Sequence, residues 1–195
     1  MLLNTNFLII ILGPTGIGKT DLSIDIAKHF NSEIISSDSR QFYKELKIGT
    51  AVPSYEQLNS VNHHFIGNKS IFDYYNASMY EIEVNNFLGN FYKTNSIALL
   101  VGGSGMYIDA VCKGIDDLPK IDFQVRKKFQ DKFENEGIES LRFELKRIDP
   151  EHYKIVDLKN PKRILKALEV YFQTGKTYTS FLTKPQKNRI FRAIK

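Results

Sequence analysis

The segment Gly13–Thr20 constrains the fold of this chain more than any other feature. Its sequence, Gly-Pro-Thr-Gly-Ile-Gly-Lys-Thr, matches the phosphate-binding pattern G-x-x-x-x-G-K-[ST], the P-loop. The apolar run Phe7–Leu12 in front of it predicts a buried central strand. Behind it, the helical spacing of three apolar residues predicts a helix over Asp21–Phe30; these are Leu22, Ile26 and Phe30. Strand, loop and helix in this order are the context in which the pattern binds phosphate.

The P-loop builds an anion site from its backbone. The N–H groups of residues 15–20 point inward, and the following helix adds its positive end. Lys19 is expected to neutralise the charge of the terminal phosphate, and the Thr20 hydroxyl is placed for Mg²⁺. The loop alone does not determine the chemistry, because the same cradle holds either a phosphoryl group in transfer or a pyrophosphate that leaves.

Apolar segments alternate with helical ones in the first part of the chain. Besides Phe7–Leu12, strands are predicted at Ser32–Ser36 and Ile97–Val101. Ser78 and Glu81 fit a capping box that opens a helix between the last two. This alternation predicts an α/β fold of the P-loop NTPase kind, with a mostly parallel sheet flanked by helices.

The pattern changes after residue 118, so residues 1–118 are predicted to form the α/β core. Residues 119–185 show helical spacings and predict an all-helical insertion, and residues 186–195 alternate and predict a strand that returns to the core. The charge changes at the same place: residues 1–118 contain 8 Lys/Arg and 12 Asp/Glu, whereas residues 119–195 contain 19 and 10. This basic excess indicates either a polyanionic partner or a solvated helical surface.

The chain of 195 residues contains one cysteine, Cys112, which excludes an internal disulfide and favours a reducing compartment. The N-terminus lacks the features of a signal peptide, and no apolar run reaches membrane-spanning length. We therefore expect a soluble, cytoplasmic protein that acts as a monomer and has no membrane partner.

Two features bear on the fate of the bound phosphates. Asp38 follows the second strand and is expected at the carboxyl edge of the sheet, where it binds Mg²⁺ through water, takes a proton from a nucleophile or caps a turn. The third strand ends in Gly102 and Gly103, with no carboxylate after it. The missing carboxylate weakens the prediction of an ATPase or GTPase. A P-loop kinase of a nucleotide or small metabolite stays open as an alternative.

Six motifs follow one another along nearly the whole chain. They are the P-loop; Ser37-Asp38-Ser39-Arg40-Gln41-x-Tyr43; Ile48-Gly49-Thr50-Ala51-x-Pro53; His63-His64-Phe65; Val101-Gly102-Gly103-Ser104-Gly105-Met106-Tyr107-Ile108; and Asn160-Pro161-x-Arg163, which continues as Arg163-x-x-x-Ala167-Leu168-Glu169-Val170. In this order they resemble the motifs of the bacterial tRNA dimethylallyltransferases, also called tRNA isopentenyltransferases.

The resemblance implies a reaction. This family transfers a dimethylallyl group from dimethylallyl diphosphate to N6 of the adenosine at position 37, in the anticodon stem-loop of tRNA, and releases diphosphate. The P-loop then holds the diphosphate with Mg²⁺, and Asp38 matches the general base, with Lys19 and Thr20 beside it. The implied diphosphate-binding residues are Gly13, Pro14, Thr15, Gly16, Ile17, Gly18, Lys19 and Thr20.

The resemblance also implies contacts with tRNA. Asp38, Ser39, Arg40 and Gln41 match the segment that contacts the target base, which must leave the stack to be reached. Further implied tRNA-binding residues are Ser104, Arg126, Lys162, Arg163, Ile164, Leu165 and Lys166. For each basic side chain among them, a phosphate contact and a solvated helix surface are both open.

Members of the family continue well beyond the position that matches Lys195, and that part supplies an arginine to the diphosphate. Arg189 and Arg192 lie too early in the sequence to match it. The chain is therefore expected to be a fragment, and an inactive tRNA-binding module is a second alternative. The pair His63-His64, on chain predicted to be irregular, is interpreted as structural rather than metal-binding.

Overall fold

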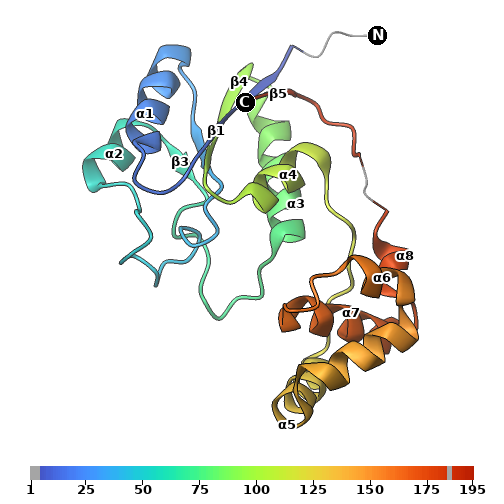
Figure 1. The fold of residues 1–195 in the computed structure, drawn as a ribbon. Helices are drawn as coiled ribbons and strands as arrows, with labels where there is room; N and C mark the ends of the chain where they lie inside the picture. The colour runs from blue at the N-terminus through green and yellow to red at the C-terminus, as the bar shows by residue number, and fades with distance from the viewer. Residues whose placement is uncertain (1–4, 184–185) are drawn as a thin grey trace. The chain divides into compact units, whose positions relative to one another are not determined.

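The computed structural model describes residues 5–183 and 186–195, and they divide into two compact units. Unit 1 comprises the described residues up to Ile115 together with residues 186–195, and unit 2 comprises residues 116–183. Figure 1 shows a sheet with helices in unit 1 and helices alone in unit 2. In the described part of the chain, no helix is long and apolar enough to cross a membrane.

Unit 1 is built on a five-stranded sheet. Its strands are β1 (Phe7–Leu12), β2 (Ile34–Ser36), β3 (His63–His64), β4 (Ile97–Gly102) and β5 (Arg192–Ile194). Their order is β3-β2-β4-β1-β5, and every pair of neighbours is parallel. The predicted parallel sheet and its three apolar strands are confirmed, and so is the returning strand, which pairs with β1.

Helices cover both faces of this sheet, because alternate strand residues point to opposite sides. The helices are α1 (Lys19–Phe30), α2 (Tyr55–Ser60), α3 (Ala77–Phe91) and α4 (Gly105–Lys113). One core contains Leu8, Ile10, Ile35 and Leu100 of the strands with Val84, Leu88 and Val111 of α3 and α4. The other contains Ile34, Leu99 and Val101 with Ile24 and Ala27 of α1. This α/β/α layering is the predicted fold.

The predicted helix over Asp21–Phe30 is confirmed as α1, although the residues that it buries are Ser23, Ile24 and Ala27, whereas Leu22 and Phe30 are exposed. The predicted start of α3 is wrong. Its N-cap is Asn76, whose side chain accepts a hydrogen bond from the N–H of Met79 at 3.0 Å, so Ser78 lies inside the helix.

Glu81 is not free for a capping box, because its carboxylate is buried and joins two distant segments. It accepts hydrogen bonds from Lys187 Nζ at 3.0 Å, from Arg189 Nη2 at 2.7 Å and from the N–H of Ile115 at 3.3 Å. The N–H of Lys187 also donates to the carbonyl of Lys113 at 2.9 Å. The segments that leave and re-enter unit 1 thus lie side by side, held by one carboxylate.

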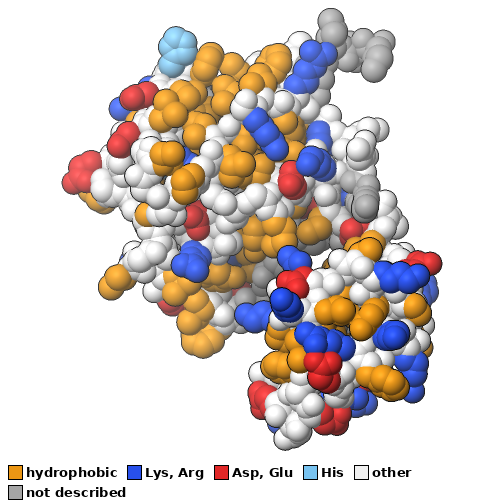
Figure 2. Space-filling model, viewed as in Figure 1, with side chains coloured by type: hydrophobic (Ala, Val, Ile, Leu, Met, Phe, Trp, Pro, Cys, Tyr) orange, Lys and Arg blue, Asp and Glu red, His pale blue; other side chains and the backbone are white. Residues whose placement is uncertain are grey.

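Unit 2 contains only helices among its described residues. They are α5 (Phe123–Ile148), α6 (Pro150–Ile155), α7 (Pro161–Thr174) and α8 (Tyr178–Phe181). Gly137 interrupts α5 with a φ of 75°, which confirms the predicted helix end there. The apolar faces of α5 and α7 form a separate core of Phe129, Leu141, Leu145, Ile164, Ala167 and Leu168. In the view of Figure 2, Lys and Arg side chains are numerous on the surface of unit 2.

Candidate functional site

The P-loop joins β1 to α1, and glycine geometry shapes it. Gly16 and Gly18 have φ angles of 83° and 88°, a left-handed conformation that disfavours side chains with a Cβ. Gly18 is the N-cap of α1, and no side chain caps this helix. The first-turn N–H groups are therefore left for a ligand, as an anion site at a helix N-terminus requires. The Lys19 ammonium folds back over the loop and donates to the carbonyl of Pro14 at 2.6 Å.

A cavity of about 300 Å³ opens at this loop. Four groups of residues line it: the loop and first turn of α1, β2 and the turn after it with Asp38, a segment between residues 51 and 66, and the end of β4. Among the lining residues are Thr15, Lys19, Thr20, Asp38, Gln41 and His63. The cavity is thus lined together by Asp38, Lys19 and Thr20.

The turn after β2 fixes the Asp38 side chain. Its carboxylate oxygen Oδ1 accepts a hydrogen bond from the N–H of Arg40 at 2.9 Å. Gln41 ties this turn to the far wall, because its amide donates to the carbonyls of Thr50 and Ala51 at 3.2 and 2.9 Å. Gln41 therefore shapes the cavity, whatever else it contacts.

The end of β4 packs tightly against the same turn. A Cβ on Gly102 would lie 2.4 Å from Ser37 Oγ and 2.6 Å from the Ser37 carbonyl carbon, so only glycine fits. Ser104 Oγ accepts a hydrogen bond from the N–H of Ser39 at 3.0 Å. Ser104 and Ser39 therefore adjoin each other. The first carboxylate after β4 is Asp109, inside α4, so no carboxylate stands at the end of this strand.

Comparison with known proteins identifies the family. The family model described as IPP transferase matches residues 41–195. The chain belongs to the IPP transferase family. It is 54% identical over 188 residues to tRNA dimethylallyltransferase 1 of Bacteroides fragilis, with 96% of this chain and 62% of that protein covered. The protein of the same name from Phocaeicola vulgatus is also 54% identical, with 63% of its length covered.

Solved structures agree with the fold of this IPP transferase family chain. A eukaryotic dimethylallyltransferase acting on tRNA has a TM-score of 0.75 at 25% identity, over 97% of this chain and 47% of that one. The tRNA delta(2)-isopentenylpyrophosphate transferase of Staphylococcus epidermidis has a TM-score of 0.56 at 30% identity, over 96% and 62%. The chain thus spans a little over 60% of the length of the curated relatives named above.

In unit 2 of this IPP transferase chain, the predicted tRNA-binding residues differ in exposure. Lys162 and Arg163 are exposed at the start of α7, and Lys166 and Leu165 are half-buried. Ile164 is 0% exposed and packs in the core of unit 2, as its apolar spacing with Leu168 predicts, so the predicted contact of this residue with tRNA would involve its backbone.

Arg126 lies on α5 and forms a long ion pair with Glu169, at 3.9 Å. Burial raises the pKa of Glu169, and the charges of Arg126 and Lys166 oppose this rise. The Arg126 side chain is 42% exposed, so the pair leaves it accessible to a phosphate.

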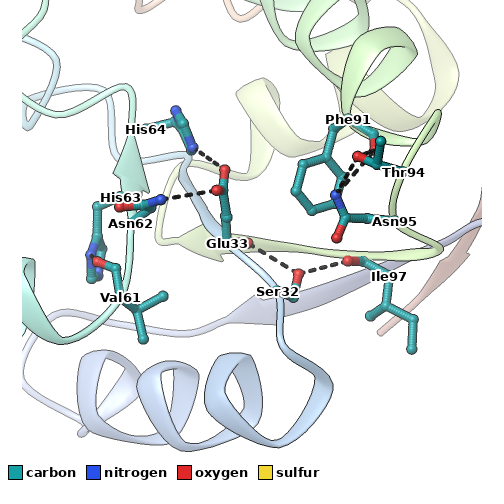
Figure 3. A network of polar contacts seen from close by, with 10 residues as sticks. All are labelled: Ser32, Glu33, Val61, Asn62, His63, His64, Phe91, Thr94, Asn95 and Ile97. Atoms are coloured by element: carbon teal, nitrogen blue, oxygen red, sulfur yellow. Dashed lines mark hydrogen bonds and ion pairs between the residues drawn. The ribbon is translucent and has the colours of Figure 1, made fainter.

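The two adjacent histidines form β3, on chain that was predicted to be irregular. Figure 3 shows that they point to different partners. His64 Nε2 lies 2.6 Å from Glu33 Oε2, and His63 Nδ1 lies 2.8 Å from the carbonyl of Val61. Burial lowers the pKa of His63, while the Val61 carbonyl opposes the shift. Within the described residues, no group of three or more metal-binding side chains occurs.

Sequence reasoning missed one wall of the cavity. This wall comes from a segment predicted to be irregular, and its lining residues are Ala51, Pro53, Gln57, His63 and Ile66. The Ser54 capping box of α2 was the available signal, since Ser54 and Gln57 bond each other reciprocally. Gln57 also donates to Asp21 at 2.6 Å and so ties this wall to α1.

Proposed function

We propose that the protein transfers a dimethylallyl group from dimethylallyl diphosphate to N6 of adenosine 37 of tRNA. The observation that carries this proposal is the single cavity lined by Asp38 and by the P-loop residues Lys19 and Thr20. A proton acceptor and a diphosphate cradle around one space suit a displacement at the allylic carbon. The dimethylallyltransferase relatives support the choice of substrates.

In the proposed reaction, one bond forms, one bond breaks and one proton moves, and this cavity contains a group for each change. The N6 nitrogen forms a bond to the allylic carbon, and the bond from that carbon to the diphosphate oxygen breaks. The electron pair leaves on the diphosphate, where the loop N–H groups and Lys19 stabilise it. The N6 proton passes to the Asp38 carboxylate. No group in this scheme accepts a phosphoryl group, which fits a β4 strand without a terminal carboxylate.

Mg²⁺ fits this arrangement. The Thr20 hydroxyl lines the cavity beside the phosphate cradle, and hydroxyl and phosphate oxygens are the hard donors that Mg²⁺ prefers. A bound Mg²⁺ would neutralise charge on the leaving diphosphate. Unit 2, with Arg126, Lys162, Arg163 and Lys166, would bind the anticodon stem-loop through phosphates. Action on tRNA would place the monomeric protein in the cytoplasm.

The test is transfer of label from dimethylallyl diphosphate to an anticodon stem-loop that carries adenosine at position 37. Asp38→Asn should lower kcat/KM by about 10²–10⁴ without changing pyrophosphate affinity, because a general base is lost and the cradle is kept. Asp25→Asn is the matched control, since Asp25 is exposed on α1 and outside the cavity. Transfer by Asp38→Asn at the wild-type rate would show that Asp38 is not the general base. Turnover of ATP with a hydroxyl acceptor, and none of dimethylallyl diphosphate, would instead identify a kinase.

A further inference from the structure

Unit 2 contains a cavity that is independent of the P-loop. It measures about 530 Å³, a size within the range of small-ligand pockets, and its lining comes from α6, α7, α8 and the residues beside them. The lining residues on which the inference depends are His152, Ile155, Lys162, Arg163, Lys166 and Tyr178. The cavity therefore combines an apolar wall, a buried imidazole and three cations within one compact unit.

His152 is the buried polar group of this cavity. It is only 7% exposed, and its Nδ1 has no hydrogen-bond partner within the described residues. Its backbone is fixed, because its N–H donates to Asp149 Oδ1 at 3.1 Å, and its ring packs on Tyr178 with centroids 4.6 Å apart. Buried polar groups are nearly always hydrogen-bonded. The unpaired Nδ1 is itself covered by protein, so the ring contributes a fixed, buried imidazole to the cavity wall.

The protonation of His152 favours a neutral partner at this point. Burial lowers its pKa from the usual 6.5, and the charge of Asp149 opposes the shift. At neutral pH the ring is therefore uncharged, with one nitrogen donating and the other accepting. Such a neutral ring packs against a planar group, such as a nucleobase, better than it binds an anion.

The anion-binding part of the cavity is formed by Lys162, Arg163 and Lys166. Within the described part of the chain none of the three forms a salt bridge, whereas Arg126, Lys132, Arg142 and Arg147 of the same unit all do. On the lining of the same cavity, Ile155 is 72% exposed, a large apolar side chain left in contact with water. An occupant that satisfies all these groups has an anionic end and a planar, partly apolar body.

We propose that this cavity binds one unstacked nucleotide of the tRNA substrate. The 5′ phosphate lies among the three cations, and the base lies against Ile155, Tyr178 and the ring of His152. This inference rests on the proposed function. The nucleotide is a second one, distinct from the adenosine to be modified, because that adenosine must reach Asp38 in the cavity of unit 1.

The first experiment measures binding of the anticodon stem-loop to the protein by fluorescence anisotropy. Ile155→Glu places a carboxylate at the exposed apolar wall and should weaken binding about tenfold. Phe143→Glu is the matched control: Phe143 is 75% exposed on α5, outside the cavity, and adds the same charge to the same unit. It should change affinity by less than about twofold. Equal effects of the two variants would overturn the proposal.

The second experiment follows the His152 ring by NMR in the intact protein. Its resonances should shift on addition of the stem-loop and stay in place on addition of inorganic phosphate. A shift with phosphate alone would reveal a simple anion site and would overturn the assignment of a nucleotide. A shift with free AMP that matches the RNA shift would mean that the cavity serves free nucleotides instead.

These measurements separate the inference from the proposed function on which it rests. If the wild-type protein fails to bind the stem-loop at all, the proposed function fails. If it binds and transfers the prenyl group, yet Ile155→Glu binds as tightly as Phe143→Glu, only the second nucleotide site is lost. Pyrophosphate binding at the P-loop should be the same in all three proteins and reports that unit 1 is folded.

Discussion

Helix α1, which follows the P-loop, begins differently from the described helices of unit 2. Helix α1 begins at Gly18 and α4 at Ser104, and neither has a side-chain cap. All four helices of unit 2 begin with a side chain that accepts a first-turn N–H, and these caps are Asp122, Asp149, Asn160 and Thr177. Helices α2 and α3, in unit 1 itself, are also capped by Ser54 and Asn76, and α2 lines the same cavity through Gln57. The uncapped start of α1 is thus a property of the P-loop, not of the whole unit.

The difference shows how each part can hold an anion. At the P-loop, the donors are backbone N–H groups whose positions depend on glycine conformation and on close backbone contacts. In unit 2, each cap already occupies one first-turn N–H group, and Lys and Arg side chains supply the positive charge that an anion needs. Substitutions that move the backbone should therefore disable the anion site at the P-loop. Substitutions of Lys and Arg side chains should disable anion binding by unit 2.

The largest predicted effect is on the backbone at the end of β4. In Gly102→Ala the new Cβ would lie 2.4 Å from Ser37 Oγ, so the Ser37–Asp38 turn must move. We expect the free energy of unfolding to fall by about 2–3 kcal/mol, as for overpacked cores, and pyrophosphate affinity to fall with it. Urea denaturation and calorimetry measure both. Gly105→Ala is the control, since its Cβ would meet no atom within 4 Å; an equal loss there would refute the argument from close contact.

A smaller effect should follow from removing a cap in unit 2. Asn160→Ala deletes the acceptor for the N–H of Arg163 and should lower the free energy of unfolding by about 1 kcal/mol. Pyrophosphate affinity should not change. Asn135→Ala, an exposed asparagine inside α5, is the matched control and should be neutral or slightly stabilising. A fall in pyrophosphate affinity in Asn160→Ala would show that the P-loop site and unit 2 are not independent.

The smallest predicted effect is on the pH dependence of stability, and two histidines contribute to it: half-buried His63 in unit 1 and buried His152 in unit 2. Burial lowers the pKa values of His63 and His152 below 6.5 in the folded protein. The unfolded chain therefore binds their protons at higher pH, so stability is full above about pH 6.5 and falls as the pH drops toward the folded pKa values. Unfolding at pH 7 and at pH 5.5 should show a smaller fall in His152→Gln than in the wild type; an unchanged fall would contradict the assignment.

Much of unit 1 could be predicted, because its signals are local and strong. The run Phe7–Leu12 and the P-loop match the structure closely, since a buried parallel strand and a glycine turn leave few alternatives. The buried face of α1 could not be predicted: Leu22 is apolar but exposed, and Ser23 is polar but buried. Ser23 is satisfied inside its own helix, where its hydroxyl donates to the Thr20 carbonyl, and composition does not reveal this.

The candidate site divides in the same way. Asp38 could be placed from the end of its strand, because the carboxyl ends of parallel strands share one edge of the sheet. The wall that includes Gln57 and His63 could not, because it depends on long-range bonds such as that from Gln57 to Asp21. Glu81 was interpreted from its neighbours in sequence, whereas its partners lie about a hundred residues later.

The carboxylate of Glu81 has a consequence for how this chain can change over evolution. Because Lys113 and Lys187 are hydrogen-bonded to each other, residues 116–184 leave the sheet-bearing unit and return at one point. In topological terms, the helical unit is a single long loop whose two ends are hydrogen-bonded to each other. The entropy of closing a loop depends only weakly on its length. A short turn could replace it and leave β5 beside β1. The helical part can therefore change in length or sequence during evolution, while the strand order of the sheet that carries the P-loop stays the same.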